Sequence, residues 1–416
     1  MNILWITPET PIPADNGHRV VYYNRIAGLS SLGHRIYLCA FIEDEREFDS
    51  RGSLLNYCQE VSLFRRDKRS KGELRSKLLP VHIAKRHCED FRREVIRYLQ
   101  EKAIDVLLID SINMAQYRPN RVGSKVLTVL CVHNVDHILF LRSALMQRDP
   151  LRKLFLLNEA LKTLVYEHRI YKNSSFDLFS FVSRTERDYI LKKYPAVKAI
   201  HSPIGVNDNG SSPNREAARK SIKTLMFIGN LSYFSNIESI AWFVHKVYPD
   251  VLKHFENVRL WIVGKQPGRQ IYELANAYRN IEVIGDVPST IPLLSQADIV
   301  IAPMISGAGV KVKILEALSA RRIVVTTRLG VDGTDLLDGK HLLVADDFDN
   351  RGFASKCLEI LTQEDSFQNV AETGYNYVTR NYSWEKTVRD FNDEILTALK
   401  RKRGNLSNGG LPFGEC

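Results

Sequence analysis

The residues best suited to chemistry lie between Ala302 and Leu318, where an apolar run is followed by glycines, lysines and a glutamate. The segment reads Ala-Pro-Met-Ile-Ser-Gly-Ala-Gly-Val-Lys-Val-Lys-Ile-Leu-Glu-Ala-Leu. Gly307 and Gly309 allow the backbone to approach a ligand closely, and we expect a helix to begin near Val310. The free N–H groups at a helix start, together with the positive end of its dipole, suit an anion such as a diphosphate.

Charged side chains strengthen this predicted anion site. Lys311 and Lys313 would hold the diphosphate, and the amides from Gly307 to Gly309 would contact sugar or phosphate. Glu316 lies further along the helix, where its carboxylate can accept hydrogen bonds from two ribose hydroxyls. A plain strand, turn and helix with a solvated glutamate is the simpler interpretation, and this segment alone leaves it open.

The segment resembles the donor-binding signature of retaining glycosyltransferases of family 4, which have the GT-B fold. Glu316 matches the second glutamate of the family's Glu–x7–Glu motif, which contacts the ribose, whereas Ala308 stands where the first glutamate would be. The sequence is most similar to the branch that reads G-x-G-x-K/R-x-K-x-x-E-A. In that branch the amides of the loop around Ala308 and Val310 hold the hexose, so the resemblance places both residues at the donor.

The resemblance extends over the C-terminal half of the chain. The loop at 227–237 has asparagines where the family usually has an Arg/Lys pair, and 261–267 matches a strand-Gly-x-x-Pro segment under the base. Residues 284–288 match a loop that cradles the nucleobase, and 328–333 match the loop before the last sheet strand. The donor-binding residues that the resemblance implies in these segments are Gly229, Asn230, Gly264 and Val287.

Two segments of the N-terminal half agree with this assignment. The loop 8–19, which reads PETPIPADNGHR, borders the donor phosphates and the acceptor in the family, so Gly17 and Arg19 become donor-binding candidates. A rigid proline-rich turn is the alternative. His133 follows a buried strand, as does the histidine of the family's HN-V-E segment, which reaches the transferred sugar or the acceptor. We therefore predict catalytic roles for His133, Lys311 and Lys313.

These motifs lie at the ends of strands in a repeating strand–helix pattern. Apolar runs alternate with helical spacing over nearly the whole chain, which predicts an α/β protein with parallel sheets covered by helices. We expect the GT-B fold, with two Rossmann-like domains facing a central cleft. The expected divisions are an acceptor-binding domain over 1–203 with 384–400 packing back on it, a nucleotide-sugar-binding domain over 204–383, and a disordered tail over 401–416.

Composition limits the possible settings of the protein. The 416 residues are 44% hydrophobic and 25% charged, which is typical of a folded protein and not of a disordered one. The N-terminus lacks the features of a signal peptide, no stretch suits a spanning helix, and the six cysteines form no CxxC pair. We expect a cytoplasmic protein, with possible peripheral attachment to the inner face of the plasma membrane.

The net charge of +10 is unevenly distributed, because residues 51–100 hold 13 Lys/Arg against 6 Asp/Glu. No DNA- or RNA-binding signature accompanies this segment, so we expect no nucleic-acid partner. The basic stretch Arg65–Arg97 is instead a candidate for contact with an anionic membrane, as often found for the corresponding insertion of the family. A solvated helical face is an equal alternative.

Together these features predict transfer of a hexose from a nucleotide sugar to a lipid-linked or polysaccharide acceptor. The donor is a UDP- or GDP-linked co-substrate, and we expect that neither a metal nor another cofactor is needed, because the lysines and loop amides can stabilise the charge of the diphosphate. Retention of the anomeric configuration is implied by the resemblance alone. Two alternatives remain open: a non-catalytic partner subunit of another glycosyltransferase with the same fold, and a sugar-nucleotide epimerase.

Overall fold

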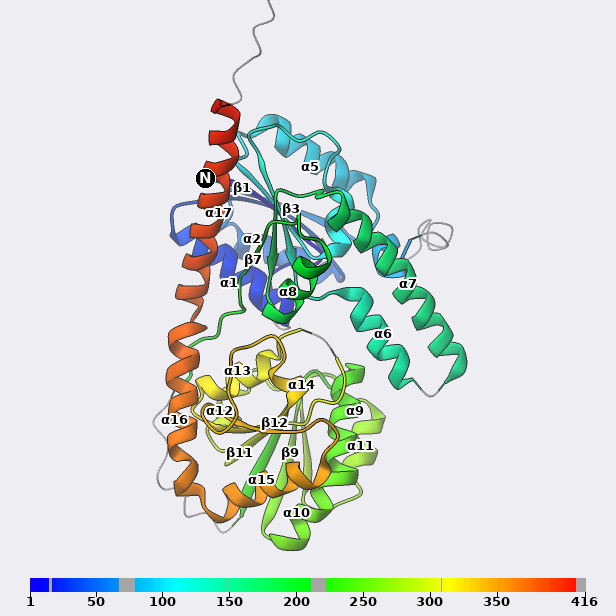
Figure 1. The fold of residues 1–416 in the computed structure, drawn as a ribbon, viewed down its shortest axis with the longest axis vertical. Coiled ribbons are helices and arrows are strands. Elements are labelled where there is room, and N and C mark those ends of the chain that lie inside the picture. The colour runs from blue at the N-terminus through cyan, green and yellow to red at the C-terminus, as the bar shows by residue number, and fades with distance from the viewer. Residues whose placement is uncertain (15–16, 67–78, 148, 211–221, 308, 409–416) are drawn as a thin grey trace, which may run out of the picture. The chain divides into compact units, whose positions relative to one another are not determined.

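The structure is a computed structural model that describes residues 1–14, 17–66, 79–147, 149–210, 222–307 and 309–408. The chain forms two compact units. The first comprises Met1–Pro203 and the residues from Trp384 onward, and the second comprises Ile204–Ser383. Each unit is built on its own parallel sheet, as Figure 1 shows. The predicted α/β class with two Rossmann-like domains is thereby confirmed.

The N-terminal unit contains a seven-stranded sheet in the order β3-β2-β1-β4-β5-β6-β7, and every neighbouring pair is parallel. The central strands are nearly continuous apolar runs because helices cover both faces of such a sheet. The strands are β1 (Asn2–Thr7), β2 (Arg35–Ile42), β3 (Glu60–Arg65), β4 (Val106–Asp110), β5 (Leu127–Val132), β6 (Leu178–Phe181) and β7 (Ala199–His201).

Helices connect these strands, and a long helical hairpin is inserted after β5. The helical elements are α1 (Gly17–Ser31), η1 (Glu45–Asp49), α2 (Ser50–Leu54), α4 (Val81–Ala84), α5 (Glu89–Glu101), η2 (Ile112–Tyr117), α6 (Asp136–Met146), α7 (Pro150–Lys172), α8 (Arg184–Lys193) and α17 (Trp384–Asn408). The hairpin consists of α6 and α7. The sequence pattern had not revealed it.

The last helix, α17, packs on α1 within the N-terminal unit. A Cβ atom on Gly28 of α1 would lie 2.8 Å from Cγ1 of Val388, so glycine allows the two helices to approach closely. The buried Arg25 guanidinium lies 4.7 Å from the centre of the Phe391 ring and donates to the Ser202 carbonyl at 2.8 Å. The helix continues to Asn408, which corrects the expectation of a tail disordered from residue 401; residues 409–416 lie outside the described part of the chain.

The C-terminal unit contains a six-stranded parallel sheet in the order β10-β9-β8-β11-β12-β13. Numbered within the unit, this is the 3-2-1-4-5-6 order of a dinucleotide-binding fold. The strands are β8 (Lys223–Ile228), β9 (Val258–Gly264), β10 (Ile281–Gly285), β11 (Ile299–Ala302), β12 (Ile323–Thr327) and β13 (Leu343–Ala345).

Helices cover both faces of this sheet. They are α9 (Phe234–Trp242), the π-turn η4 (Phe243–Val247), α10 (Tyr248–His254), α11 (Arg269–Ala275), α12 (Ile291–Leu294), α13 (Val312–Ser319), α14 (Arg328–Val331), α15 (Asn350–Thr362) and α16 (Glu364–Asn381). One apolar cluster includes Phe227, Ile262 and Phe353, and a second includes Met226, Val263 and Leu315. The alternating side chains of β8 and β9 thus divide between two cores. In the described part of the chain, no helix has the length and apolarity to span a bilayer.

Candidate functional site

The C-terminal unit has a topological switch point between β8 and β11. These neighbouring strands are parallel, and the chain leaves them in opposite directions along the sheet. Ligands of open α/β sheets bind at such points, outside the carboxyl ends of the strands. The loop after β8 begins at Gly229, and the loop after β11 leads into α13. The predicted donor motif therefore lies where the topology favours a ligand.

Lys313 links these two loops. Its Nζ donates to Asn236 Oδ1 at 2.7 Å and lies 4.4 Å from the centre of the Phe227 ring. Asn236 in turn donates through Nδ2 to the Asn230 carbonyl at 2.8 Å. The lysine from α13 is thus fixed against the start of α9 and the end of β8.

Glycines at the ends of β8 and β9 make room for this arrangement. A Cβ on Gly229 would lie 2.8 Å from Asn236 Nδ2 and 3.0 Å from Lys313 Nζ. A Cβ on Gly264 would lie 1.6 Å from the Gly229 carbonyl oxygen. Gly264, predicted to allow approach to a base, is therefore required first for packing of one backbone on another.

The loop before α13 needs glycine for its conformation. Gly307 and Gly309 have φ angles of 107° and 70°, in the left-handed region that strains other residues. Between them, the predicted donor residue Ala308 lies outside the described residues. Lys311 is buried, and its Nζ donates to the Gly309 carbonyl at 2.6 Å. Among the described residues, none caps the start of α13 through a side chain, so its N–H groups are open to an anion.

The surroundings of α13 disfavour the charged forms of its two ionisable side chains, Lys313 and Glu316. Burial, together with the nearby Lys311 charge, lowers the pKa of Lys313 to about 7. Burial also raises the pKa of Glu316 to about 7, although the Lys313 charge opposes this shift. No hydrogen bond to the Glu316 carboxylate occurs within the described residues. A bound diphosphate would favour the lysine cation, and ribose hydroxyls would favour the carboxylate.

Other predicted donor residues have different surroundings. The Asn230 side chain accepts from the Ser232 backbone N–H at 2.9 Å and from its hydroxyl at 2.7 Å, which caps the turn after β8. Val287 and Val310 are partly buried and both pack against the apolar cluster that includes Met226, Val263 and Leu315. Asn236, and not Asn230, thus presents its side chain to Lys313.

The N-terminal unit has its own switch point between β1 and β4, and a buried His–Asp pair lies beside it. His133 follows β5, and its Nε2 lies 2.5 Å from Oδ1 of Asp110, the last residue of β4. The other Asp110 oxygen accepts from Trp5 Nε1 at 3.1 Å. The Nδ1 atom of His133 is buried and has no hydrogen-bond partner within the described residues. Sequence reasoning found His133 but missed Asp110, whose signal was a carboxylate at the end of a buried strand.

Aromatic side chains from α1 complete this cluster. The His18 and Tyr22 rings lie 5.0 Å and 5.7 Å from the His133 ring, centre to centre. The Tyr22 hydroxyl is also buried without a partner in the described part of the chain. Although 52% of the His18 side chain is exposed, desolvation by the surrounding protein and the nearby His133 lower its pKa to about 4. Neutral, partly unsatisfied polar groups of this kind suit a hydroxyl-bearing ligand.

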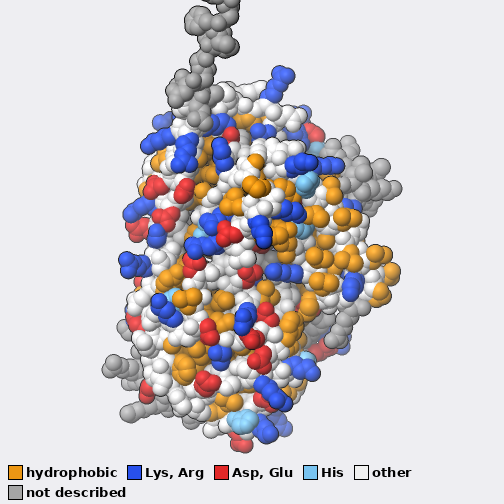
Figure 2. Space-filling model, viewed as in Figure 1, with side chains coloured by type: hydrophobic (Ala, Val, Ile, Leu, Met, Phe, Trp, Pro, Cys, Tyr) orange, Lys and Arg blue, Asp and Glu red, His pale blue; other side chains and the backbone are white. Residues whose placement is uncertain are grey.

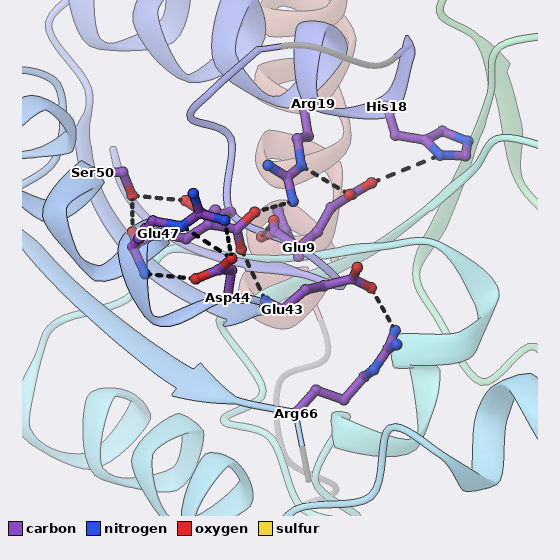
Figure 3. Close-up of polar contacts among 11 residues, drawn as sticks. Glu9, His18, Arg19, Glu43, Asp44, Glu47, Ser50 and Arg66 are labelled. Carbon is purple, nitrogen blue, oxygen red and sulfur yellow. Dashed lines mark hydrogen bonds and ion pairs between the residues drawn. The ribbon is translucent and has the colours of Figure 1, made fainter. Parts of the chain in front are cut away.

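Arg19 is engaged by two carboxylates. Figure 3 shows its guanidinium between Glu9 and Glu47, with Nε 2.9 Å from Glu9 Oε2 and Nη2 2.6 Å from Glu47 Oε1. Only 7% of its side chain is exposed. Arg19 therefore holds the loop after β1 through Glu9, and its donor binding stays a prediction. Gly17 is the exposed first residue of α1, and residues 15–16 lie outside the described ranges.

The described residues contain no group of three or more His, Cys, Asp or Glu side chains arranged to hold a metal ion. The predicted basic membrane segment is described only in part. At its start, Arg65 Nη1 lies 2.5 Å from Glu45 and Arg66 Nη1 lies 2.7 Å from Glu43, while residues 67–78 lie outside the described part of the chain. The remaining basic residues of α5 pair with acidic residues, as Arg97 does with Glu94.

Comparisons with known proteins agree with this geometry. Residues 222–363 match the family model described as "Glycosyl transferases group 1". An uncharacterized 44.6 kDa protein in the cps region of Klebsiella pneumoniae is 26% identical over 400 residues, covering 92% of this chain and 97% of that protein. A phosphatidyl-myo-inositol mannosyltransferase of Mycobacterium leprae is 26% identical over 193 residues, covering 45% and 50% of the two chains.

A solved structure extends the similarity to the whole fold. The sucrose-phosphate synthase from Thermosynechococcus elongatus superimposes with a TM-score of 0.72 at 15% identity, covering 95% of this chain and 98% of that one. At this identity the likeness concerns the fold alone. Residues 222–363 thus resemble a glycosyltransferase group 1 domain, and together these findings support a transferase with the GT-B fold.

Proposed function

We propose that the protein transfers a hexose from a UDP- or GDP-linked donor to a lipid-linked or polysaccharide acceptor, with retention of configuration and without a metal ion. The observation that carries the proposal is the Lys313 cation, fixed by Asn236 at the switch point of the C-terminal sheet beside an uncapped helix start. Such a site matches a diphosphate in charge and in hydrogen-bond donors.

In this proposal the donor diphosphate lies at the start of α13. Lys313 and the loop amides stabilise the negative charge that develops on the leaving nucleotide, which is the role that a metal ion fills in other enzymes. Glu316 accepts hydrogen bonds from the ribose hydroxyls. The donor would thus favour the charged forms of Lys313 and Glu316, which desolvation disfavours in the free protein.

The acceptor side of the proposal rests on the N-terminal unit. His133 Nδ1 and the Tyr22 hydroxyl are buried polar atoms without partners in the described residues, so either can bind a hydroxyl of the acceptor or of the transferred sugar. Asp110 would fix the orientation and tautomer of His133 through Nε2. The relatives' names support the acceptor class, since one protein is encoded in a cps region and the other is named for a phosphatidyl-inositol substrate.

The first test is ligand binding followed by turnover. We expect UDP- or GDP-hexoses to raise the melting temperature by several degrees in a thermal-shift panel. Donor consumption is then measured with a membrane extract as the acceptor source. Glu316→Ala and Lys313→Met should strongly reduce both effects, whereas Lys253→Met, at an exposed lysine of the same unit, should leave them unchanged. Full activity of Glu316→Ala would contradict the proposed site.

The same assay separates the alternatives. A non-catalytic partner subunit would bind the nucleotide sugar without consuming it when the extract is added. An epimerase would change the sugar without releasing free nucleotide. Activity that persists in excess EDTA supports metal independence, and activity lost in EDTA and restored by a divalent cation would contradict it. We propose a cytoplasmic location with peripheral attachment to the inner face of the plasma membrane, where a lipid-linked acceptor would lie.

A further inference from the structure

The α6–α7 hairpin of the N-terminal unit exposes an unusual amount of apolar surface. Of the eighteen large hydrophobic side chains that are exposed in the described residues, eight lie between Leu141 and Val165. Figure 2 shows the same accumulation of orange side chains over this hairpin, at the right-hand edge of the view. Monomeric proteins rarely leave large contiguous apolar patches in water, so this surface requires a partner.

The exposed residues follow helical spacing and therefore form one face. On α7 many of these residues are three, four or seven positions apart; they include Leu151, Leu154, Phe155, Leu161 and Val165. The exposed fractions of Leu151, Leu154 and Leu161 are 79%, 66% and 61%. The opposite face of α7 is the buried one. The hairpin is thus apolar on its outer side, which is the reverse of an ordinary surface helix.

The acidic side chains of the two helices, by contrast, are turned toward the protein interior. Glu159 and Glu167 are buried, where Glu159 accepts from the Val81 N–H at 2.6 Å and Glu167 accepts from the Asp136 N–H at 2.8 Å. On α6 and α7, no Asp or Glu is exposed, and between them Asp149 caps the start of α7. Lys162 pairs with Glu159 at 2.9 Å. The other basic residues of the two helices are also exposed or half-buried, namely Arg142, Arg152, Lys153, Arg169 and Lys172.

We infer that this face of the α6–α7 hairpin inserts into the surface of an anionic lipid bilayer. An apolar face flanked by cations, with its acids turned inward, is the pattern of an interfacial helix, in which leucines enter the acyl boundary and lysines and arginines contact lipid phosphates. The hairpin replaces the basic segment 65–97 as the surface that meets the bilayer. The inference rests on the proposed function in one respect: a lipid-linked acceptor would give the protein a reason to bind the bilayer.

The experiment uses the full-length protein and vesicles of phosphatidylcholine, alone or mixed with phosphatidylglycerol. Wild type should co-sediment with the mixed vesicles and much less with the neutral ones. Changing Leu151, Leu154 and Leu161 together to serine should lower the partition coefficient at least about tenfold. The control pair, Leu32→Ser and Leu55→Ser, also replaces exposed leucines of this unit and should bind as wild type does. Arg152→Glu with Lys153→Glu should remove the preference for anionic lipid.

Three results would overturn the inference. In the first, the serine variant binds vesicles as wild type does. In the second, binding is lost only when Arg65, Arg66, Lys68 and Arg69 become glutamate. In the third, wild type binds no vesicles and sedimentation velocity shows a dimer that the serine substitutions dissociate, so that the apolar face contacts a second copy of the chain. The melting temperature and the UDP-induced thermal shift of the serine variant are measured in parallel. Because the changed side chains are exposed and remote from the donor loops in sequence, both should equal those of wild type. Failure of vesicle binding is therefore distinguishable from failure of the proposed transferase site.

Discussion

At the residue scale, the proposed donor site depends on two groups whose charges are costly to bury. Lys313 lies against an aromatic ring and a carboxamide, and its pKa falls to about 7 because the cation is poorly solvated there. Glu316, on the same helix, has its pKa raised to about 7 for the same reason. Functional sites often concentrate perturbed groups of this kind, because a ligand supplies the missing partner.

The first prediction concerns the pH dependence of UDP binding. A diphosphate stabilises the Lys313 cation, so above pH 7 binding must take up the proton that the free protein has lost. By linkage, the affinity then falls as pH rises, by about tenfold between pH 7 and 8.5. Calorimetric titration of the wild-type protein over this range measures the slope. Lys313→Met should bind weakly with little dependence on pH, and a flat wild-type profile would contradict the assignment.

The second prediction is that Glu316→Gln stabilises the protein while it impairs catalysis. The folded-state pKa is raised from 4.5 to about 7, so this group lowers stability as pH rises from about 4.5 to 7, and the loss is complete above pH 7. The amide avoids burial of a charge and should add on the order of 2 kcal/mol at pH 8 and little at pH 4. Urea denaturation at both pH values tests this, with Glu256→Gln as the exposed control. An equal effect at both pH values would show that charge is not the cause.

The third prediction tests Asp110 as a positioning residue. Asp110→Asn keeps the shape of the side chain but removes the charge that fixes His133. We expect kcat to fall roughly 100-fold with little change in the donor KM, because the proposed donor site belongs to the other unit. If donor affinity fell as much as kcat, Asp110 would have a general structural role.

At the element scale, the loop before α13 is held in shape by its glycines. Gly307→Ala meets no atom closer than 3.5 Å, so its cost comes from the left-handed backbone and should be about 1–2 kcal/mol, with weaker donor binding. Gly264→Ala would overlap the Gly229 carbonyl and should destabilise much more. Gly268→Ala has free space and should be neutral. Melting temperatures that do not follow this order would contradict the geometry.

Elements with local signals were predictable, and those that depend on tertiary partners were not. Apolar runs such as Asn2–Thr7 predicted parallel strands because both faces of the sheet are covered. The pattern of α7 was unreadable because glutamates are buried and leucines are exposed, which inverts the usual signal. The pairing of Arg19 with Glu47 was not predictable, because the two residues lie far apart in the sequence.

The same distinction applies to the site. The proximity of Lys313 and Glu316 was predictable because one helix carries both, at a spacing set by the helix. Asp110, His18 and Tyr22 come from three separate segments that meet only in the folded unit. Asn236 was considered with Asn230, and only its contact with Lys313 distinguishes the two.

At the scale of the whole molecule, the chain completes its N-terminal unit with its last helix. It leaves this unit after Pro203, forms the C-terminal unit, and returns at Trp384. The returning helix contributes buried Val388, Phe391 and Ile395 to the N-terminal unit. Stability of the N-terminal unit therefore depends on residues that are translated only after the C-terminal unit is complete.

This connectivity makes a prediction that separates the two units. Phe391→Ala removes a fully buried ring that also stacks on the Arg25 guanidinium, and should cost the N-terminal unit about 3–5 kcal/mol. Because the proposed donor loops belong to the C-terminal unit, UDP should still stabilise that unit by the wild-type amount. Calorimetry with and without UDP tests both statements, and deletion of residues 409–416 serves as a control that leaves α17 intact. If Phe391→Ala weakened UDP binding as strongly as it lowered stability, the donor site would depend on the N-terminal unit, and the assignment of binding to the C-terminal unit alone would fail.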